Sequence, residues 1–297
     1  MVAPPRKLHN ALVSEILACE ACGLSTSEWR LGPSCVLSRC PSCGHIVRDL
    51  ERCRARARTH PWGGSGVFDR MRSKLTMRNL RRAMPARERL DVLEIGFGRG
   101  ILLSELHERG HRVSGIDPGM LERDLAEPLR SLNTLRAEPA EAARLEQNSF
   151  DLIYGIHVVE HLQSPSEMFR SIYRALRPGG LLYVMTPNAR SKGLHLFREA
   201  WWNLEDPTHV RFFSPRSISI MLRAAGFGRV QTRIPIWDSL TVEVSSLIRM
   251  RGSDPGEHGI MSVRALMPLY ALLSPVALCA RTVWPELSPS MEVMAWK

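Results

Sequence analysis

The chain has 297 residues, of which 44% are hydrophobic, and carries a formal net charge of +10. This length suits one large domain with a smaller one beside it, and the hydrophobic content is sufficient for a sizeable core. Between positions 48 and 89, 13 basic residues stand against 4 acidic ones, so the rest of the chain is nearly neutral, which argues against a nucleic-acid-binding surface over the whole protein. Positions 1–18 contain charges and no long apolar run, so we expect no signal peptide and a cytoplasmic location.

Four cysteines near the N-terminus have the spacing of a zinc ribbon. They follow the pattern C-x2-C-x17-C-x2-C, and four such thiolates complete a tetrahedral shell around Zn²⁺. A closed shell leaves no open position, so we predict a structural zinc and a small module over residues 1–60. Its ligands would be Cys19, Cys22, Cys40 and Cys43. The remaining Cys35, Cys53 and Cys279 are expected to be unpaired, since this cysteine usage indicates a reducing compartment and metal binding rather than a disulfide framework.

Residues 61–89 are predicted to form a basic linker and a helix, the helix running from about 67 to 83. Two interpretations of its arginines stay open. They form a solvated face on a helix that covers the neighbouring ligand pocket, or they contact a phosphate-bearing substrate or an anionic membrane surface. RNA is less favoured, because few aromatic residues lie between the basic ones.

Residues 92–100 read Val-Leu-Glu-Ile-Gly-Phe-Gly-Arg-Gly, which predicts a strand that enters a glycine turn. Glycines let the backbone turn tightly and approach a ligand closely. The apolar run that follows predicts a helix whose first N–H groups face the same ligand. The next strand ends on Asp117, 21 residues after Gly96, and an acid at that place suits the hydroxyls of a ribose.

Three later segments continue the alternation of strands and helices along the chain. Residues 148–154 are predicted to form a buried strand, 159–162 to begin a helix, and 176–184 to form a turn that leads into a further strand. With the Glu-x-Gly-x-Gly-x-Gly turn, which differs from the dinucleotide pattern G-x-G-x-x-G, this order resembles the class I S-adenosylmethionine (SAM) methyltransferases. The resemblance covers about residues 90–232 and the last strand. It is closest to the ubiquinone-type O-methyltransferases and to the branch acting in glycan, lipid and antibiotic pathways, where a similar cysteine module also occurs.

This resemblance implies an α/β, Rossmann-like, doubly wound sheet of seven strands. The methyltransferase domain would occupy residues 90–297, with a helical insertion at about 237–290. The resemblance also implies the SAM contacts, which would be Glu94, Gly96, Phe97, Gly98, Gly100, Asp117, Ala140 and His157.

The segments 155–161, 186–188 and 206–213 should meet at the carboxyl ends of the strands, where ligands bind in such sheets. An oxygen nucleophile must lose a proton, and histidine can accept it near neutral pH, so His161 and His209 are the candidate catalytic residues. Glu160 and His161 also match the family's Glu-x-x-Glu-His segment, which binds a divalent cation. His157 stands where the first glutamate would be, so we favour the base over the cation.

Within the insertion, the segment 265–280 carries no charge, but it contains two prolines and is too short and too broken to cross a bilayer. We expect a helix packed on the sheet or a substrate lid, with peripheral contact to a membrane or to a lipid-linked substrate as the alternative.

The sequence therefore predicts a SAM-dependent methyltransferase that acts on oxygen of a glycan, a lipid or a secondary metabolite. Three alternatives stay open: an RNA methyltransferase, a sugar C-methyltransferase and a non-catalytic SAM-binding interaction protein. The sequence does not specify the methyl acceptor or the oligomeric state.

Overall fold

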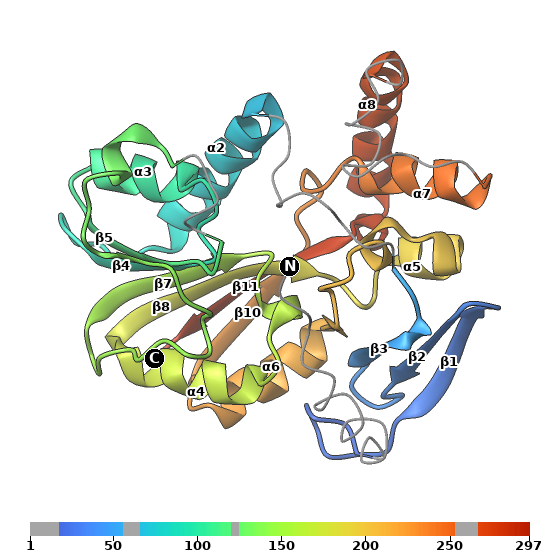
Figure 1. Cartoon of the computed structure of the whole chain (residues 1–297), viewed down its shortest axis with the longest axis horizontal. Helices are drawn as coiled ribbons and strands as arrows, with labels where there is room; N and C mark the ends of the chain where they lie inside the picture. The colour runs from blue at the N-terminus through green and yellow to red at the C-terminus, as the bar shows by residue number, and fades with distance from the viewer. Residues whose placement is uncertain (1–17, 56–65, 120–124, 253–266) are drawn as a thin grey trace, which may run out of the picture.

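The structure is a computed structural model and describes residues 18–55, 66–119, 125–252 and 267–297 (Figure 1). The linker predicted at 61–65 and the arginines at 56 and 58 lie outside the described residues. So does the segment 1–17 of the predicted cysteine module.

A seven-stranded sheet forms the centre of the molecule and has the order β10-β11-β8-β7-β4-β5-β6. The strands β4 to β8 run parallel, whereas β11 lies antiparallel between β8 and β10. The central strands are buried on both faces, as their continuous apolar sequences require. The prediction of a doubly wound seven-stranded sheet is confirmed. Its strands are β4 (Asp91–Ile95), β5 (Arg112–Ile116), β6 (Leu135–Arg136), β7 (Phe150–Ile156), β8 (Leu176–Pro187), β10 (Arg229–Arg233) and β11 (Ser290–Trp296).

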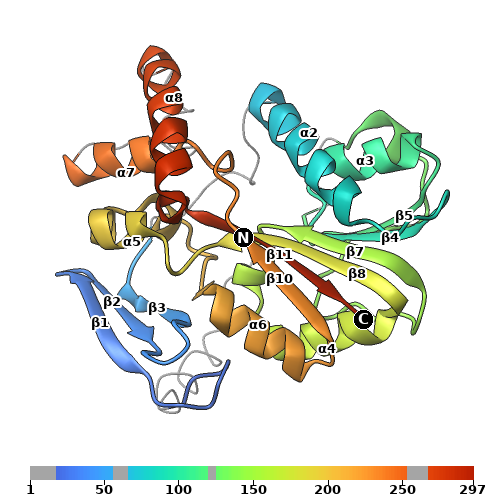
Figure 2. The same cartoon turned by 180° about the vertical axis from the view of Figure 1, so that it is seen from behind.

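Helices cover both faces of this sheet (Figures 1 and 2). The helices α2 (Gly66–Ala83) and α3 (Ile101–Glu108) pack on one face, and α4 (Pro165–Ala175) and α6 (Pro215–Ala224) pack on the other. The α6 helix begins as its sequence predicts, because Ser214 and Ser217 form a capping box and Pro215 occupies the first turn. Shorter helical turns are Glu127–Leu129, Val159–His161, Arg198–Ala200, Trp202–Leu204 and Pro285–Leu287.

The N-terminal module is a second, smaller sheet that is completed by a strand from the C-terminal half of the chain. Its strands are β1 (Ser27–Gly32), β2 (Cys35–Arg39) and β3 (Ile46–Cys53), and the fourth strand is β9 (Arg211–Phe212). Ile46 pairs with Phe212, and both side chains lie in one buried core together with Trp201. The module is therefore continuous in packing with the loop that precedes α6.

Cys35 and Cys53 face each other across β2 and β3 and form a disulfide with an S–S distance of 2.03 Å. The expectation that both would be unpaired is wrong. Their separation along the sequence does not show that the two strands pair in a register that brings the sulfurs together. Cys279 is a free, exposed cysteine.

The insertion between β10 and β11 contains α7 (Val242–Met250) and α8 (Met267–Val283), and α8 projects away from the sheet (Figures 1 and 2). The expectation that this helix packs on the sheet is therefore wrong for most of its length. Arg281 fixes its base, since this buried guanidinium bonds Glu243 and the carbonyl oxygen of Asp238. Within the described parts of the chain, no helix has the length and apolar character needed to cross a bilayer. The chain between β8 and β9 contains one more helix, α5 (Lys192–Phe197).

Candidate active site

Three glycines shape the turn between β4 and α3. Gly96, Gly98 and Gly100 have φ angles of +71°, +57° and +72°, in the left-handed region that disfavours side chains. A Cβ atom on Gly96 would lie 2.4 Å from Cγ2 of Val158, and one on Gly100 would lie 2.2 Å from Cδ1 of Leu129. The turn therefore requires glycine, and it leaves the N-terminus of α3 at the carboxyl edge of the sheet, as a cofactor site needs.

Asp117 follows the neighbouring strand β5 and is held against this turn. Its Oδ2 accepts the backbone N–H of Gly98 at 2.8 Å, and its Oδ1 accepts that of Gly119 at 2.8 Å. The carboxylate is almost fully buried. It therefore has a fixed orientation beside the glycine turn, which is the place predicted for a ribose contact.

Three of the predicted SAM contacts lie below or beside the turn. The Glu94 carboxylate is buried and accepts the Tyr154 hydroxyl at 2.7 Å, and burial raises its pKa to about 8. The Phe97 ring lies in the core, where a Cβ on Gly115 would be 2.5 Å from it. Ala140 is half-buried in the turn after β6. The side chains of Glu94 and Phe97 are thus buried in the interior, a placement that the spacing of the motif does not reveal.

His157, which begins the loop after β7, bridges two buried carboxylates. Its Nδ1 lies 3.2 Å from Oε1 of Glu160, and its Nε2 lies 3.3 Å from Oδ2 of Asp238. Burial alone would lower the pKa of His157, but the hydrogen bonds to Asp238 and Glu160 outweigh it and raise the pKa to about 9. An imidazolium in this position joins the loop after β7 to the loop after β10.

Glu160, His161 and His209 form a compact cluster next to this bridge, with ligand atoms that all lie within 4.8 Å of one another. The Nδ1 of His209 donates to the carbonyl oxygen of Asn203 at 2.9 Å, so its Nε2 carries the lone pair, 3.1 Å from Oδ2 of Asp206. Burial lowers the pKa of His209 to about 4. His209 is therefore neutral at pH 7 and can accept a proton at Nε2.

The two predicted catalytic histidines differ in the directions of their ring nitrogens. Both nitrogens of His161 face carbonyl oxygens, Nδ1 that of Thr208 at 3.0 Å and Nε2 that of His157 at 3.1 Å. Its ring lies 4.8 Å from the His209 ring. His161 therefore positions the cluster in this conformation, whereas His209 presents the basic nitrogen.

The N-terminal module fixes the loop that carries His209. Arg48 on β3 is buried, and its guanidinium donates to the carbonyl oxygens of Cys53, Leu204, Asp206 and His209 at 2.9, 2.6, 2.7 and 3.3 Å. Burial lowers the pKa of Arg48 to about 10, a shift that the charges of Asp206 and Glu205 oppose. The backbone N–H of Arg48 also donates to the carbonyl oxygen of Val210 at 2.9 Å.

A second arginine holds the other end of this loop. Arg211 on β9 bonds both carboxylate oxygens of Glu20 at 2.7 and 3.1 Å and the carbonyl oxygen of Leu162 at 2.6 Å. Next to it, the Ser214 hydroxyl donates to the carbonyl oxygen of Cys43. The cysteine module therefore contacts the loop at several points close to His209.

The four N-terminal cysteines come together as the sequence predicts. The Sγ atoms of Cys19 and Cys43 lie 3.5 Å apart, and those of Cys22 and Cys40 lie 3.6 Å apart. A tetrahedral Zn²⁺ with Zn–S bonds of about 2.3 Å needs sulfur separations of roughly 3.8 Å. The arrangement therefore fits a structural zinc.

Arg48, Arg211 and Asp238 matter to this site, yet the sequence did not single them out as functional. Asp238 lies in the insertion, far along the chain from His157, which it contacts. Arg48 lies in a basic stretch where no arginine differs from its neighbours. Among these three residues, only Arg211 lies in a segment, 206–213, that the sequence placed at the site.

Comparisons with known proteins agree with this geometry. A family model described as "Methyltransferase domain" matches residues 68–232. A ubiquinone biosynthesis O-methyltransferase of Pseudomonas entomophila is 35% identical over 107 residues, which are 34% of this chain and 46% of that protein. The corresponding protein of Nitrosospira multiformis is 29% identical over 187 residues, which are 59% of this chain and 76% of that protein. The chain thus spans about half the length of the first relative.

A solved structure shares the fold. The SAM-dependent methyltransferase from Mesorhizobium loti aligns with a TM-score of 0.51 at 18% identity and covers 74% of this chain and 96% of that one. At this identity the likeness concerns the fold alone.

Proposed function

This chain belongs to the methyltransferase-domain family, and from that premise we propose that it is a SAM-dependent methyltransferase that acts on an oxygen atom of a glycan, lipid or secondary-metabolite acceptor. The observation that carries the proposal is His209, a buried, neutral histidine with a proton-accepting nitrogen beside Asp206, at the carboxyl edge of the sheet. The named O-methyltransferases among the relatives support the choice of oxygen.

SAM supplies a methyl group that is already activated by its positively charged sulfur, so the protein must align the acceptor and exclude water. The glycine turn and Asp117 are placed to hold the cofactor. Val158 links the two halves of the site, because it packs against Gly96 and follows His157 directly. The acceptor would bind between the glycine turn and the His209 loop.

A hydroxyl acceptor must lose its proton as the methyl group arrives. We assign that proton to Nε2 of His209, where Asp206 at 3.1 Å and Glu160 at 3.8 Å stabilise the resulting imidazolium. Arg48, Arg211 and His161 position this histidine and do not themselves react.

The same cluster could hold a divalent cation, with Glu160, His161 and His209 as ligands. Two observations favour the base. Both oxygens of Glu160 already have partners, namely His157 at 3.2 Å and Thr186 at 2.9 Å, and both ring nitrogens of His161 face carbonyl oxygens. A bound cation would have to replace these hydrogen bonds.

We also propose that the four-cysteine cluster binds one structural Zn²⁺. The sulfur separations and the closed set of four thiols support a site without an open position, and hence without a catalytic role.

Methyl transfer can be tested with SAM that carries a ¹³C-labelled methyl group. Purified protein is incubated with lipid, sugar-nucleotide and small-RNA fractions, and the labelled products are identified by NMR, with Gly98→Val as the inactive control. The proposal predicts a methyl group bonded to oxygen in a lipid or small-molecule fraction. A label on nitrogen or carbon, or only in RNA, would replace it.

A further inference from the structure

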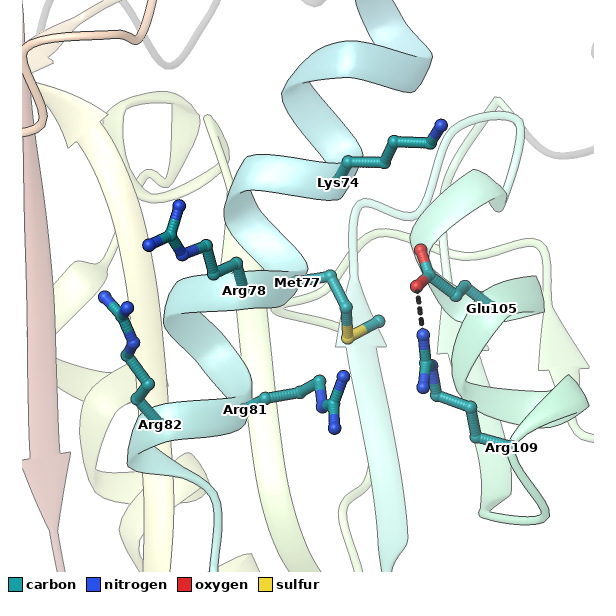
Figure 3. Close-up of a pocket in the computed structure, with 7 residues that line it drawn as sticks. All are labelled: Lys74, Met77, Arg78, Arg81, Arg82, Glu105 and Arg109. Carbon is teal, nitrogen blue, oxygen red and sulfur yellow. Dashed lines mark hydrogen bonds and ion pairs between the residues drawn. The ribbon is translucent and has the colours of Figure 1, made fainter.

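A groove of about 390 Å³ lies between α2 and α3 (Figure 3). Lys74, Met77 and Arg81 project from α2 toward α3, and Glu105 and Arg109 project back from α3. Arg78 and Arg82 complete the lining from α2. The groove thus combines five cationic side chains with one carboxylate, and that carboxylate is bonded to Arg109 at 2.8 Å.

The four basic side chains that α2 contributes to the groove have no ion-pair partner among the described residues. Lys74, Arg78, Arg81 and Arg82 are exposed, and none of them forms a hydrogen bond or ion pair with any described residue. Arg78 lies one helical turn from Lys74 on one side and from Arg82 on the other, and like charges at this spacing repel each other. The helix therefore keeps an unfavourable arrangement that a bound anion would relieve.

The groove is held by a fixed framework. Met77 and Leu80 of α2 are buried in the core, and Asn79 donates to Glu292 on β11 at 3.0 Å. The α2 backbone therefore cannot shift freely to separate the arginines. Arg81 points into the groove, and its guanidinium offers the directional N–H groups that bind phosphate oxygens in pairs, whereas Arg78 and Arg82 point away from α3 (Figure 3).

The position of the groove separates it from the methyl-transfer site. Arg109 directly follows α3, whereas the glycine turn precedes its start, and the helix between them spans roughly 12 Å. Arg81 and Arg82 likewise occupy the last turn of α2, shortly before the chain enters the amino end of β4. A phosphate group bound between Arg81 and Arg109 would therefore lie away from the glycine turn.

We propose that the α2–α3 groove is a second binding site, which takes a ligand with a phosphate or pyrophosphate group. The group would lie between Arg81 and Arg109, next to Lys74, and Arg78 and Arg82 would add positive charge from the outer side of α2. This chemistry is shared by free phosphorylated metabolites and by phospholipid headgroups, and the site goes beyond the proposed methyl transfer.

Pyrophosphate is the probe, titrated into the full chain by calorimetry. The test variant is Arg78→Gln with Arg81→Gln. The matched control is Arg170→Gln with Arg223→Gln, two exposed residues on α4 and α6 across the sheet, which removes the same charge. We expect one site per chain, a loss of at least about tenfold in affinity in the test variant, and a change below about twofold in the control. Equal losses in both variants, or no binding by the unaltered chain, would overturn the proposal.

A second experiment identifies the source of the phosphate group. Vesicles of phosphatidylcholine with and without phosphatidic acid are sedimented with the protein. Binding that requires phosphatidic acid, is displaced by pyrophosphate and is lost in the test variant assigns a lipid headgroup, whereas pyrophosphate binding without vesicle binding assigns a free ligand. Vesicle binding that persists in the test variant contradicts the site. SAM affinity is measured in parallel and should be unchanged in both variants. A failure of the proposed function would therefore appear in the SAM titration, whereas a failure of the second site would appear in the pyrophosphate titration.

Discussion

Replacing Arg48 by methionine should separate the N-terminal module from the loop that carries His209. The substitution keeps most of the side-chain length but removes a guanidinium that donates to the carbonyl oxygens of Cys53, Leu204, Asp206 and His209. Hydrogen bonds from a charged donor contribute about 1.5–3 kcal/mol each. Part of this sum is offset by the cost of burying the charge, which the lowered pKa of Arg48 reflects. The substitution leaves four carbonyl oxygens without this donor, and an unsatisfied buried acceptor costs about 1–3 kcal/mol, so after the offset we expect the free energy of unfolding to fall by about 3–5 kcal/mol.

The effect should be local as well as global. Hydrogen exchange followed by mass spectrometry should show faster exchange across residues 204–212, because the amide of Val210 donates to the carbonyl oxygen of Glu160 in the ordered loop. SAM affinity should stay near that of the unaltered chain, since the glycine turn makes no contact with Arg48. Arg52→Ala is the control: this arginine on the same strand is 44% exposed and pairs with Glu28, so its loss should cost less than about 1 kcal/mol.

If Arg48→Met unfolds with a free energy within about 1 kcal/mol of the unaltered chain, and exchange across 204–212 is unchanged, the module does not hold the acceptor-side loop. If Arg48→Met is too unstable to purify, Arg48→Lys is the substitution to measure instead. One ammonium cannot reach all four carbonyl oxygens, so the loop should still exchange faster while the chain stays folded.

Three further predictions concern the metal, the buried bridge and the base. Elemental analysis should find one zinc ion per chain, and the Cys40→Ser variant should lose it. In that variant, hydrogen exchange should be faster in the loop before α6, while SAM affinity should change little. Purified protein that contains no zinc would contradict the site. The pKa of His157 is raised from 6.5 to about 9, so its stabilising effect is complete below pH 6.5 and is lost as pH rises through 9. Unfolding titrations should show a loss of at most about 3 kcal/mol over that interval, and the slope should vanish in His157→Gln. Because the pKa of His209 is about 4, the single-turnover rate should fall only as pH approaches 4. The His209→Asn substitution should lower the single-turnover rate by about 10²–10⁴-fold. If chelators abolish the rate and divalent ions restore it, the cluster is a metal site instead.

The sequence predicted the features that depend on local signals. The glycine turn and Asp117 at the end of β5 each follow from a few adjacent residues whose backbone requirements are specific. The paired cysteine motifs were equally informative, because two tight turns with two thiols each have few other uses. These elements also fixed the order of the central strands through the family resemblance.

Features that depend on contacts between distant segments were not predictable in this way. The pairing of β3 with β9 joins segments from opposite halves of the chain, and the short strand β9 carries no strand signal of its own. The disulfide between Cys35 and Cys53 depends on the register of β2 and β3. The direction in which Phe97 points is set by the space beside Gly115, which the motif does not encode.

The central claim is that the carboxyl edge of the sheet binds SAM through the glycine turn and Asp117, and calorimetric titration of SAM tests it most directly. We predict one site per chain, no measurable binding in Gly98→Val, because the side chain would occupy a backbone with φ of +57°, and at least about tenfold weaker binding in Asp117→Ala. Arg170→Gln, on the far side of the sheet, should bind as the unaltered chain does. Unchanged SAM affinity in both Gly98→Val and Asp117→Ala would contradict the account.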